Sequence, residues 1–347
     1  MIDTDLLLRG AAAGVLLLHA LVLALPGPRA AARAALGGWA LSLVGYLAGQ
    51  RPELLLAMPR ALALVLLALA VTGAGWFWLA MRAAFDDGFA WRPAFVAALA
   101  ALLALGLAAN VPYLPPPGGT AFVTPPPGAA PLVVLHDAAL MAFALAALAE
   151  VLRGWRADLV ETRRAARRWV ALAIAVYGVA TLAVELALRG RDVGPLLPAL
   201  HVAAIGAIAL ALAVLLVRRS LDDLLGLHAP PAPRAAPPDP ALQKLERAMA
   251  EARLYRRDGL TLAALAGELG LGEAALRTLI NQRLGFRNFN DFLHHHRLNE
   301  AQARLVAEDL PILSIALDCG YGSIGPFNRA FKARFGMTPS AWRAKAR

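Results

Sequence analysis

Seven apolar stretches fill most of the first 217 residues, and they constrain the fold more than any other feature of the sequence. A helix needs about 20 apolar residues to cross the hydrocarbon core of a bilayer, which is about 30 Å thick. The whole chain is 59% hydrophobic and only 17% charged. The stretches cover residues 6–25, 34–50, 59–81, 93–113, 131–152, 169–188 and 196–217, and the second is the shortest. The sequence therefore predicts a bundle of seven transmembrane helices.

The arginines between these stretches predict the orientation, because cytoplasmic loops carry an excess of Lys and Arg. With the N-terminus outside, twelve arginines fall in inner loops and four in outer loops. The inner ones are Arg29, Arg33, Arg82, Arg92, Arg153, Arg156, Arg163, Arg164, Arg167, Arg168, Arg218 and Arg219. The outer ones are Arg51, Arg60, Arg189 and Arg191. We expect a multi-pass protein of the inner (cytoplasmic) membrane whose C-terminal part lies in the cytoplasm. The six arginines of residues 153–168 are interpreted as a topology determinant attracted to anionic lipid.

Polar side chains inside apolar stretches are costly in lipid, so they mark candidate functional positions. Five such residues lie near the outer ends of the fourth to seventh stretches in the predicted orientation. They are Asn110, His136, Asp137, Glu185 and His201. We predict that they form an outward-facing pocket that senses a small-molecule or ionic signal. The alternative is that each group simply reaches water or backbone near the interface. No metal site is predicted.

A proline-rich segment divides the chain into two parts of different composition. Residues 226–240 contain six prolines, which favour an extended, semi-rigid spacer. From residue 241 onward, sixteen Lys and Arg stand against ten Asp and Glu, and the whole chain carries a formal charge of +10. A basic balance of this size suits nucleic acid or anionic lipid. We therefore predict a transmembrane domain at 1–219, a linker at 220–240 and a soluble helical domain at 241–347.

Residues 311–343 have the pattern of two short helices joined by a tight turn. Apolar residues at positions 312, 315, 316 and 319 form one helical stripe, and Gly320 begins the break. Ser323 is predicted to cap the second helix. The inward positions of that helix are Phe327, Ala330, Phe331 and Phe335, and the outward ones are Asn328, Arg329 and Lys332. A helix with an apolar back and such a polar front suits the DNA major groove. The alternative is an ordinary helical hairpin with a solvated basic face.

The same pattern occurs about fifty residues earlier, in residues 261–285. Its second helix leaves Arg277, Thr278 and Asn281 outward. A helix of 19 residues, from Phe289 to Ala307, separates the two pairs. At about 1.5 Å per residue it is about 28 Å long, close to the ~34 Å between successive major-groove faces. Two candidate DNA-reading helices held one turn of DNA apart are a specific arrangement.

Residues 260–343 resemble the DNA-binding domain of AraC/XylS-type bacterial transcription regulators. The resemblance rests on three segments: LTLAALAGELGL, LGFRNFNDFLHHHRLNEA and IALDCGYGSIGPFNRAFKARFGMTPSAWR. It covers about a quarter of the chain and implies a double helix-turn-helix domain that binds promoter DNA. The candidate DNA contacts are Arg277, Asn281, Asn328, Arg329 and Lys332.

Taken together, these patterns predict an all-α chain with a seven-span helical bundle followed by a soluble double helix-turn-helix domain. The leading hypothesis is a membrane-embedded one-component transcription regulator. The alternative is a seven-span receptor-like or transport protein whose basic tail docks a protein or lipid partner. No phosphate loop or nucleophile–base spacing points to an enzyme, and no cofactor is predicted. The expected partners are promoter DNA, the lipid bilayer, an unknown signal and a second copy of the chain.

Overall fold

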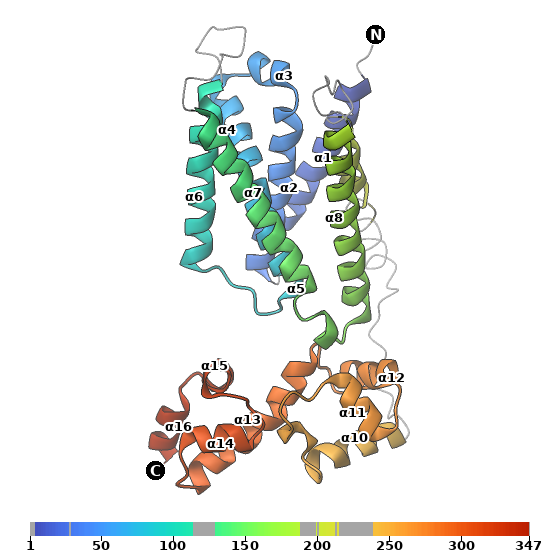
Figure 1. The fold of residues 1–347 in the computed structure, drawn as a ribbon, viewed down its shortest axis with the longest axis vertical. Helices are drawn as coiled ribbons and strands as arrows, with labels where there is room; N and C mark the ends of the chain where they lie inside the picture. Colours follow the sequence, from blue (N-terminus) through green and yellow to red (C-terminus); the bar gives the residue numbers. More distant parts are fainter. Residues whose placement is uncertain are drawn as a thin grey trace. The chain divides into compact units, whose positions relative to one another are not determined.

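The computed structural model is helical throughout the residues that it describes, and these contain no named strand (Figure 1). The described residues are 4–27, 29–113, 129–187, 199, 201–211, 214 and 239–346. The chain divides into two compact units. Unit 1 is Met1–Arg153 with Arg168–Pro230, and unit 2 is Gly154–Arg167 with Pro231–Arg347. Unit 2 thus includes a segment that the sequence placed in the first domain. Most of the proline-rich linker lies outside the described residues.

Unit 1 is built from long apolar helices. They are α1 (Thr4–Ala24), α2 (Ala30–Gly49), α3 (Pro52–Ala57), α4 (Arg60–Val71), α5 (Gly73–Phe85), α6 (Pro93–Asn110), a 3-10 turn (Val111–Tyr113), α7 (Ala129–Leu152) and α8 (Glu161–Ala187). A further apolar helix covers His201–Ala211. The first residues of α8 belong to unit 2 and the rest to unit 1.

Three of the described helices are long and apolar enough to cross a membrane, namely Asp5–Ala24, Pro93–Asn110 and Pro131–Ala157. Helices α4 and α5 make a fourth when counted as one span, bent by 53°. The stretches predicted at 34–50, 169–188 and 196–217 do not meet the same test among the described residues. The number of seven spans therefore stays a prediction.

Polar and small residues let the helices of unit 1 pack closely. Arg9, only 4% exposed, donates to the carboxylate of Asp5 at 2.7 Å and to the carbonyl of Leu47 at 2.8 Å. The guanidinium of Arg9 is therefore hydrogen-bonded to both α1 and α2. On α2, a Cβ added at Gly45 would lie 2.5 Å from the Leu66 carbonyl oxygen. Only glycine permits this approach of α2 to α4.

Unit 2 consists of short helices that follow the predicted pattern. Its C-terminal domain contains α10 (Pro240–Ala250), a 3-10 turn (Leu254–Arg256), α11 (Leu262–Leu269), α12 (Glu273–Thr278), a π-helical turn (Leu279–Arg283), α13 (Phe289–Ala307), α14 (Ile312–Asp318), α15 (Ile324–Phe335) and α16 (Pro339–Ala346). In Figure 1, α12 and α15 lie on opposite sides of α13.

Two separate hydrophobic cores lie along α13, so the domain has two subdomains joined by one helix. Phe289, Phe292 and Leu293 of α13 belong to the first core, with α10, α11 and α12. Leu298 and Leu305 belong to the second core, whose other members come from the segment after α13. The predicted connecting helix is therefore present with its predicted bounds, and both of its ends are fixed by burial of apolar side chains.

Most local features of the two helix-turn-helix units agree with the sequence pattern, and two do not. Ile315, Ala316 and Cys319 are fully buried, as the apolar stripe predicts. Ser323 stands at the N-cap of α15, but its side chain makes no capping hydrogen bond. The apolar spacing from Leu242 to Tyr255 predicts one helix, but α10 ends at Ala250, and Arg253 adopts a left-handed conformation with a φ of 48°.

Candidate nucleic-acid interface

Helix α15 presents its polar candidates to solvent. Asn328, Arg329 and Lys332 are exposed, whereas Phe327 and Phe331 are fully buried. The centroids of the two buried rings are 5.6 Å apart. These rings fix the rotation of the helix in the second core, and the two cations and the amide are thereby held outward. Such a face can reach phosphate oxygens and the edges of bases in a groove.

Helix α12 places its predicted contacts differently. Arg277 was expected to point outward, but it is only 8% exposed and pairs with Glu273 one turn earlier. Asn281 is half-buried and donates from Nδ2 to the carbonyl of Phe286 at 2.9 Å. Both side chains are therefore engaged within the domain. For Asn281, the wider π-helical turn Leu279–Arg283 shifts the face that a regular 3.6-residue period predicts.

Other polar residues occupy the exposed side of this region. Thr278, Gln282 and Arg283 are exposed. The sequence pattern had placed Thr278 outward, but it did not single out Gln282 and Arg283. The sequence signal for these two residues was that both are polar and lie just before the turn at Gly285. The spacing of apolar residues does not predict the π-helical turn that exposes them. They join the candidates for DNA contact.

A buried arginine connects the two subdomains. Arg297 of α13 is 8% exposed and donates to the backbone carbonyls of Tyr255 at 2.6 Å and Arg257 at 2.9 Å. Its guanidinium carbon lies 5.6 Å from the centroid of the Tyr321 ring, in the turn of the second helix-turn-helix unit. A planar cation that binds two carbonyls and faces a ring holds the two units in a fixed relation.

The three consecutive histidines of α13, His294 to His296, are all half-buried. Nδ1 of His294 lies 2.9 Å from the hydroxyl oxygen of Tyr321. The ring of His296 stacks on that of Tyr255, with centroids 5.5 Å apart. Burial, together with the neighbouring His295, lowers the pKa of His296 to about 4. Tyr255 and Tyr321 thus contact α13 outside its apolar stripe, and the histidine rings pack against them.

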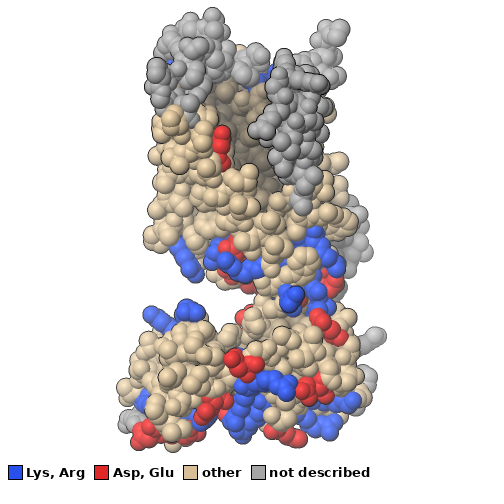
Figure 2. Space-filling view, in the orientation of Figure 1, with Lys and Arg blue, Asp and Glu red and all other residues tan. Residues whose placement is uncertain are grey.

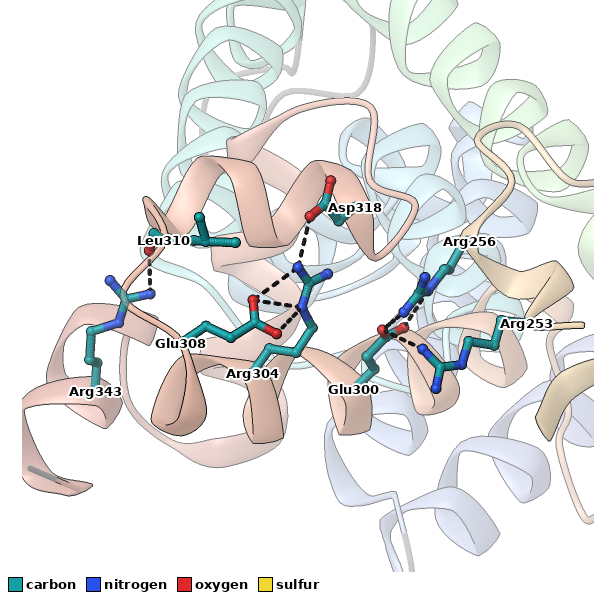
Figure 3. A network of polar contacts seen from close by, with 8 residues as sticks. All are labelled: Arg253, Arg256, Glu300, Arg304, Glu308, Leu310, Asp318 and Arg343. Atoms are coloured by element: carbon teal, nitrogen blue, oxygen red, sulfur yellow. Dashed lines mark hydrogen bonds and ion pairs between the residues drawn. The ribbon is translucent and has the colours of Figure 1, made fainter. Parts of the chain in front are cut away.

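A second group of arginines is held by carboxylates along the C-terminal half of α13 (Figure 3). Arg304 donates to Glu308 at 2.9 Å and to Asp318 at 2.8 Å. Glu300 accepts from Arg256 and lies 3.7 Å from Arg253. These residues line an open polar groove. Their charges are matched within the domain, so the network fastens α13 to α14 and to the 3-10 turn at Leu254–Arg256, and we do not count it among the DNA contacts.

The residues of the predicted sensing pocket lie on several helices of unit 1. His136 on α7 is 4% exposed, and its Nε2 lies 3.0 Å from the carbonyl of Val71, where α4 ends at the bend. Asn110 on α6 donates to the carbonyl of Gly106 at 2.9 Å. A Cβ at Gly106 would lie 2.9 Å from Nε2 of His136, so these two candidates share one neighbourhood.

The other three members are not gathered at that point by any described contact. Nδ1 of His201 lies 2.8 Å from the hydroxyl oxygen of Tyr46. Asp137 is exposed, and the side chain of Glu185 lies outside the described residues. Within the described part of the chain, no three His, Cys, Asp or Glu residues are grouped to hold a metal ion.

Comparison with known proteins addresses the C-terminal domain. A family model described as a helix-turn-helix domain matches residues 265–345. The probable transcription factor PqrA of Proteus vulgaris is 31% identical over 93 residues, which are 27% of this chain and 75% of that protein. The chain belongs to the AraC family of DNA-binding transcription regulators. Another AraC-family relative, the regulatory protein SoxS of Escherichia coli K12, is 39% identical over 67 residues, or 19% of this chain and 58% of SoxS.

A solved structure is similar over about a third of the chain. The C-terminal domain of AraT, a response regulator from Geobacillus stearothermophilus, is 28% identical and covers 31% of this chain and 86% of that one. Its TM-score of 0.29 is too low to support a structural argument. The AraC-family match identifies a DNA-binding regulator and not an enzyme. It favours this interpretation over the alternative of a basic tail that docks a protein or lipid. The family model matches residues of unit 2 only.

Proposed function

We propose that this AraC-family protein is a membrane-embedded one-component regulator, in which unit 1 senses a signal and the C-terminal domain binds promoter DNA sequence-specifically. The observation that carries the proposal is the presence of membrane-length helices and an AraC-type domain in one chain. Helix α1 has 21 residues, which correspond to about 31 Å at ~1.5 Å per residue. This length matches the hydrocarbon core of a bilayer, about 30 Å thick.

The surface of unit 1 supports a lipid environment. Many large apolar side chains are exposed there, including Leu8 (63%), Leu21 (62%), Val134 (68%) and Met141 (62%). On the face shown in Figure 2, most of the described surface of unit 1 carries neither Lys or Arg nor Asp or Glu. Water-soluble monomers rarely expose contiguous apolar surface on this scale, whereas helices in lipid must present apolar side chains outward.

The remaining parts of the proposal concern orientation and ligands. The excess of arginines in alternate loops supports an inner-membrane location, with the N-terminus outside and the C-terminal domain in the cytoplasm. Polar residues near the outer ends of the apolar stretches support a small-molecule or ionic signal. A homodimer would let two C-terminal domains bind neighbouring half-sites on DNA.

Fusions to a reporter that is active only in the cytoplasm test the membrane part. Activity is expected after Arg219 and within residues 153–168, and none within residues 114–130. The reverse pattern would overturn the orientation. The DNA part is tested with the full chain in detergent micelles. Its affinity for duplex DNA should fall steeply as salt rises, and it should prefer a genomic target over random sequence. Failure to bind any duplex at low salt would contradict the regulator model.

A further inference from the structure

The connection between α7 and α8 is packed into the first core of the DNA-binding domain. This segment, Gly154–Arg167, belongs to unit 2. Leu159 is 2% exposed and is a member of the first core, together with residues of α10 to α13. Ala157 packs against the same core. A fully buried leucine makes a large contribution to the stability of the core that holds it.

Backbone pairing fixes the place where the segment docks. Asp158 and Asn288 form an isolated antiparallel bridge. The amide of Leu159 donates to the carbonyl of Arg287 at 3.0 Å. Asn288 is also the N-cap of α13, and its side chain accepts from the amide of Asn290 at 2.8 Å. The segment therefore pairs with the residues that begin the helix joining both subdomains.

Ion pairs within the segment hold its shape. Asp158 is 1% exposed and accepts from Nε of Arg167 at 3.2 Å and from the amide of Val160 at 3.1 Å. Nε of Arg163 lies 4.0 Å from the same carboxylate. A buried carboxylate is stable only with such partners. Two of the six arginines that the sequence assigned to membrane topology therefore brace this segment.

We infer that Gly154–Arg167 is a docking element that couples α7 and α8 to the first helix-turn-helix subdomain. Its binding surface comprises Arg287, Asn288 and the first core, and the occupant is this segment of the same chain. The inference rests on the proposed function, because it supplies the route by which a change in unit 1 reaches the DNA-binding domain. Movement of α7 against α8 would withdraw Leu159 and expose the start of α13.

Disulfide trapping in the full chain tests the contact. Asp158→Cys and Asn288→Cys are introduced together, since a bridged antiparallel pair has the Cα separation that a disulfide requires. A protease site is placed within residues 226–240, so that cleavage separates the two halves unless a disulfide joins them. The buried Cys319 is retained. After mild oxidation in native membranes, we expect the halves to stay joined until reductant is added.

Matched variants define the control and the outcomes. Asp158→Cys with Lys332→Cys places the second thiol on the exposed face of α15 and should give at least tenfold less joined product. In the 158/288 pair, Leu159→Asp should reduce trapping roughly tenfold, because it brings an unpaired charge to a buried site. Ala166→Asp adds the same charge at an exposed position and should change trapping less than twofold. Trapping no greater than in the control pair, or equal with and without Leu159→Asp, would overturn the inference.

Hydrogen exchange of the full chain gives an independent readout. Leu159→Asp should speed amide exchange over residues 279–293, whereas Ala166→Asp should not. Unchanged exchange in Leu159→Asp would also reject the docking element. Salt-dependent DNA binding by the full chain in detergent micelles tests the proposed function separately. If the full chain binds DNA but the disulfide does not form, the docking element fails and the regulator model stands.

Discussion

Arg297 donates from its guanidinium Nε to the backbone carbonyl of Tyr255 at 2.6 Å, across 42 positions of the sequence. The same side chain reaches the carbonyl of Arg257. An AraC-family domain with two separate cores needs such a tie, because α13 is the main apolar connection between the subdomains. In the proposed mode of DNA binding, rigid spacing matters because the two recognition helices would contact successive major-groove faces together.

Removal of this tie should destabilise the domain. Arg297→Ala leaves two carbonyls without their charged donor and should lower the free energy of unfolding by about 2–4 kcal/mol. Urea denaturation of residues 239–347 measures the change. Arg283→Ala, on an exposed arginine, is the control and should stay within about 0.5 kcal/mol of the parent. Equal stability of the two variants would show that the hydrogen bonds of Arg297 do not contribute to the free energy of unfolding.

Two substitutions on helix α15 should separate an effect on stability from an effect on DNA binding. Phe331→Ala leaves a cavity in the second core and should cost about 3–5 kcal/mol of stability. Arg329→Ala should change stability by less than about 0.5 kcal/mol. It should weaken DNA binding by about 1–3 kcal/mol. Loss of a phosphate contact would also reduce the salt slope, the slope of log affinity against log salt concentration, by about one. If Arg329→Ala melts early or binds DNA like the parent, the DNA-contact face has been placed incorrectly.

On α12 and the π-helical turn, the buried and exposed arginines should behave differently. Arg277→Ala removes a packed side chain and its pair with Glu273, so it should reduce stability by about 1–3 kcal/mol. Arg283→Ala should spare the fold and reduce the salt slope of DNA binding by about one. Melting curves and binding titrations across salt concentrations measure both. If Arg277→Ala is as stable as the parent but its DNA affinity depends less steeply on salt, Arg277 contacts DNA after all.

The domain should lose stability in mild acid. Folded His296 has a pKa of about 4, whereas an unperturbed histidine has a pKa of 6.5. Between these values the unfolded state binds more protons, so the free energy of unfolding falls as pH decreases through this window. One such histidine contributes a slope of at most ~1.4 kcal/mol per pH unit. His296→Gln should reduce the dependence of the free energy of unfolding on pH, measured from about pH 7 to about pH 5.

Burial also lowers the pKa of His294 and of His295, so part of the slope should remain in that variant. An Asn299→Ala variant, which changes an exposed neighbour without titrating, should keep the parent slope. A parent domain whose stability does not change with pH across this window would contradict the assignment of His296 as half-buried and neutral.

The sequence by itself determined the regular parts of this protein. Apolar residues at helical spacing set the stripes of α11, α14 and α15, and Phe289 to Ala307 form the connecting helix with the predicted bounds. These features depend on neighbours three or four positions apart, which a sequence displays directly. The same spacing placed Phe327 and Phe331 inside and Arg329 outside, where the structure has them.

Tertiary structure decided which polar groups are turned inward. Arg277 and Arg297 are charged residues on helices, and their burial depends on Glu273 and on two carbonyls about 40 positions away. Leu159 looks like part of a basic loop, yet its segment pairs with Asn288, 130 positions later (288 − 158). A buried polar or loop residue is stable only where distant partners satisfy it. Spacing along the chain does not reveal those partners, because folding alone brings them together.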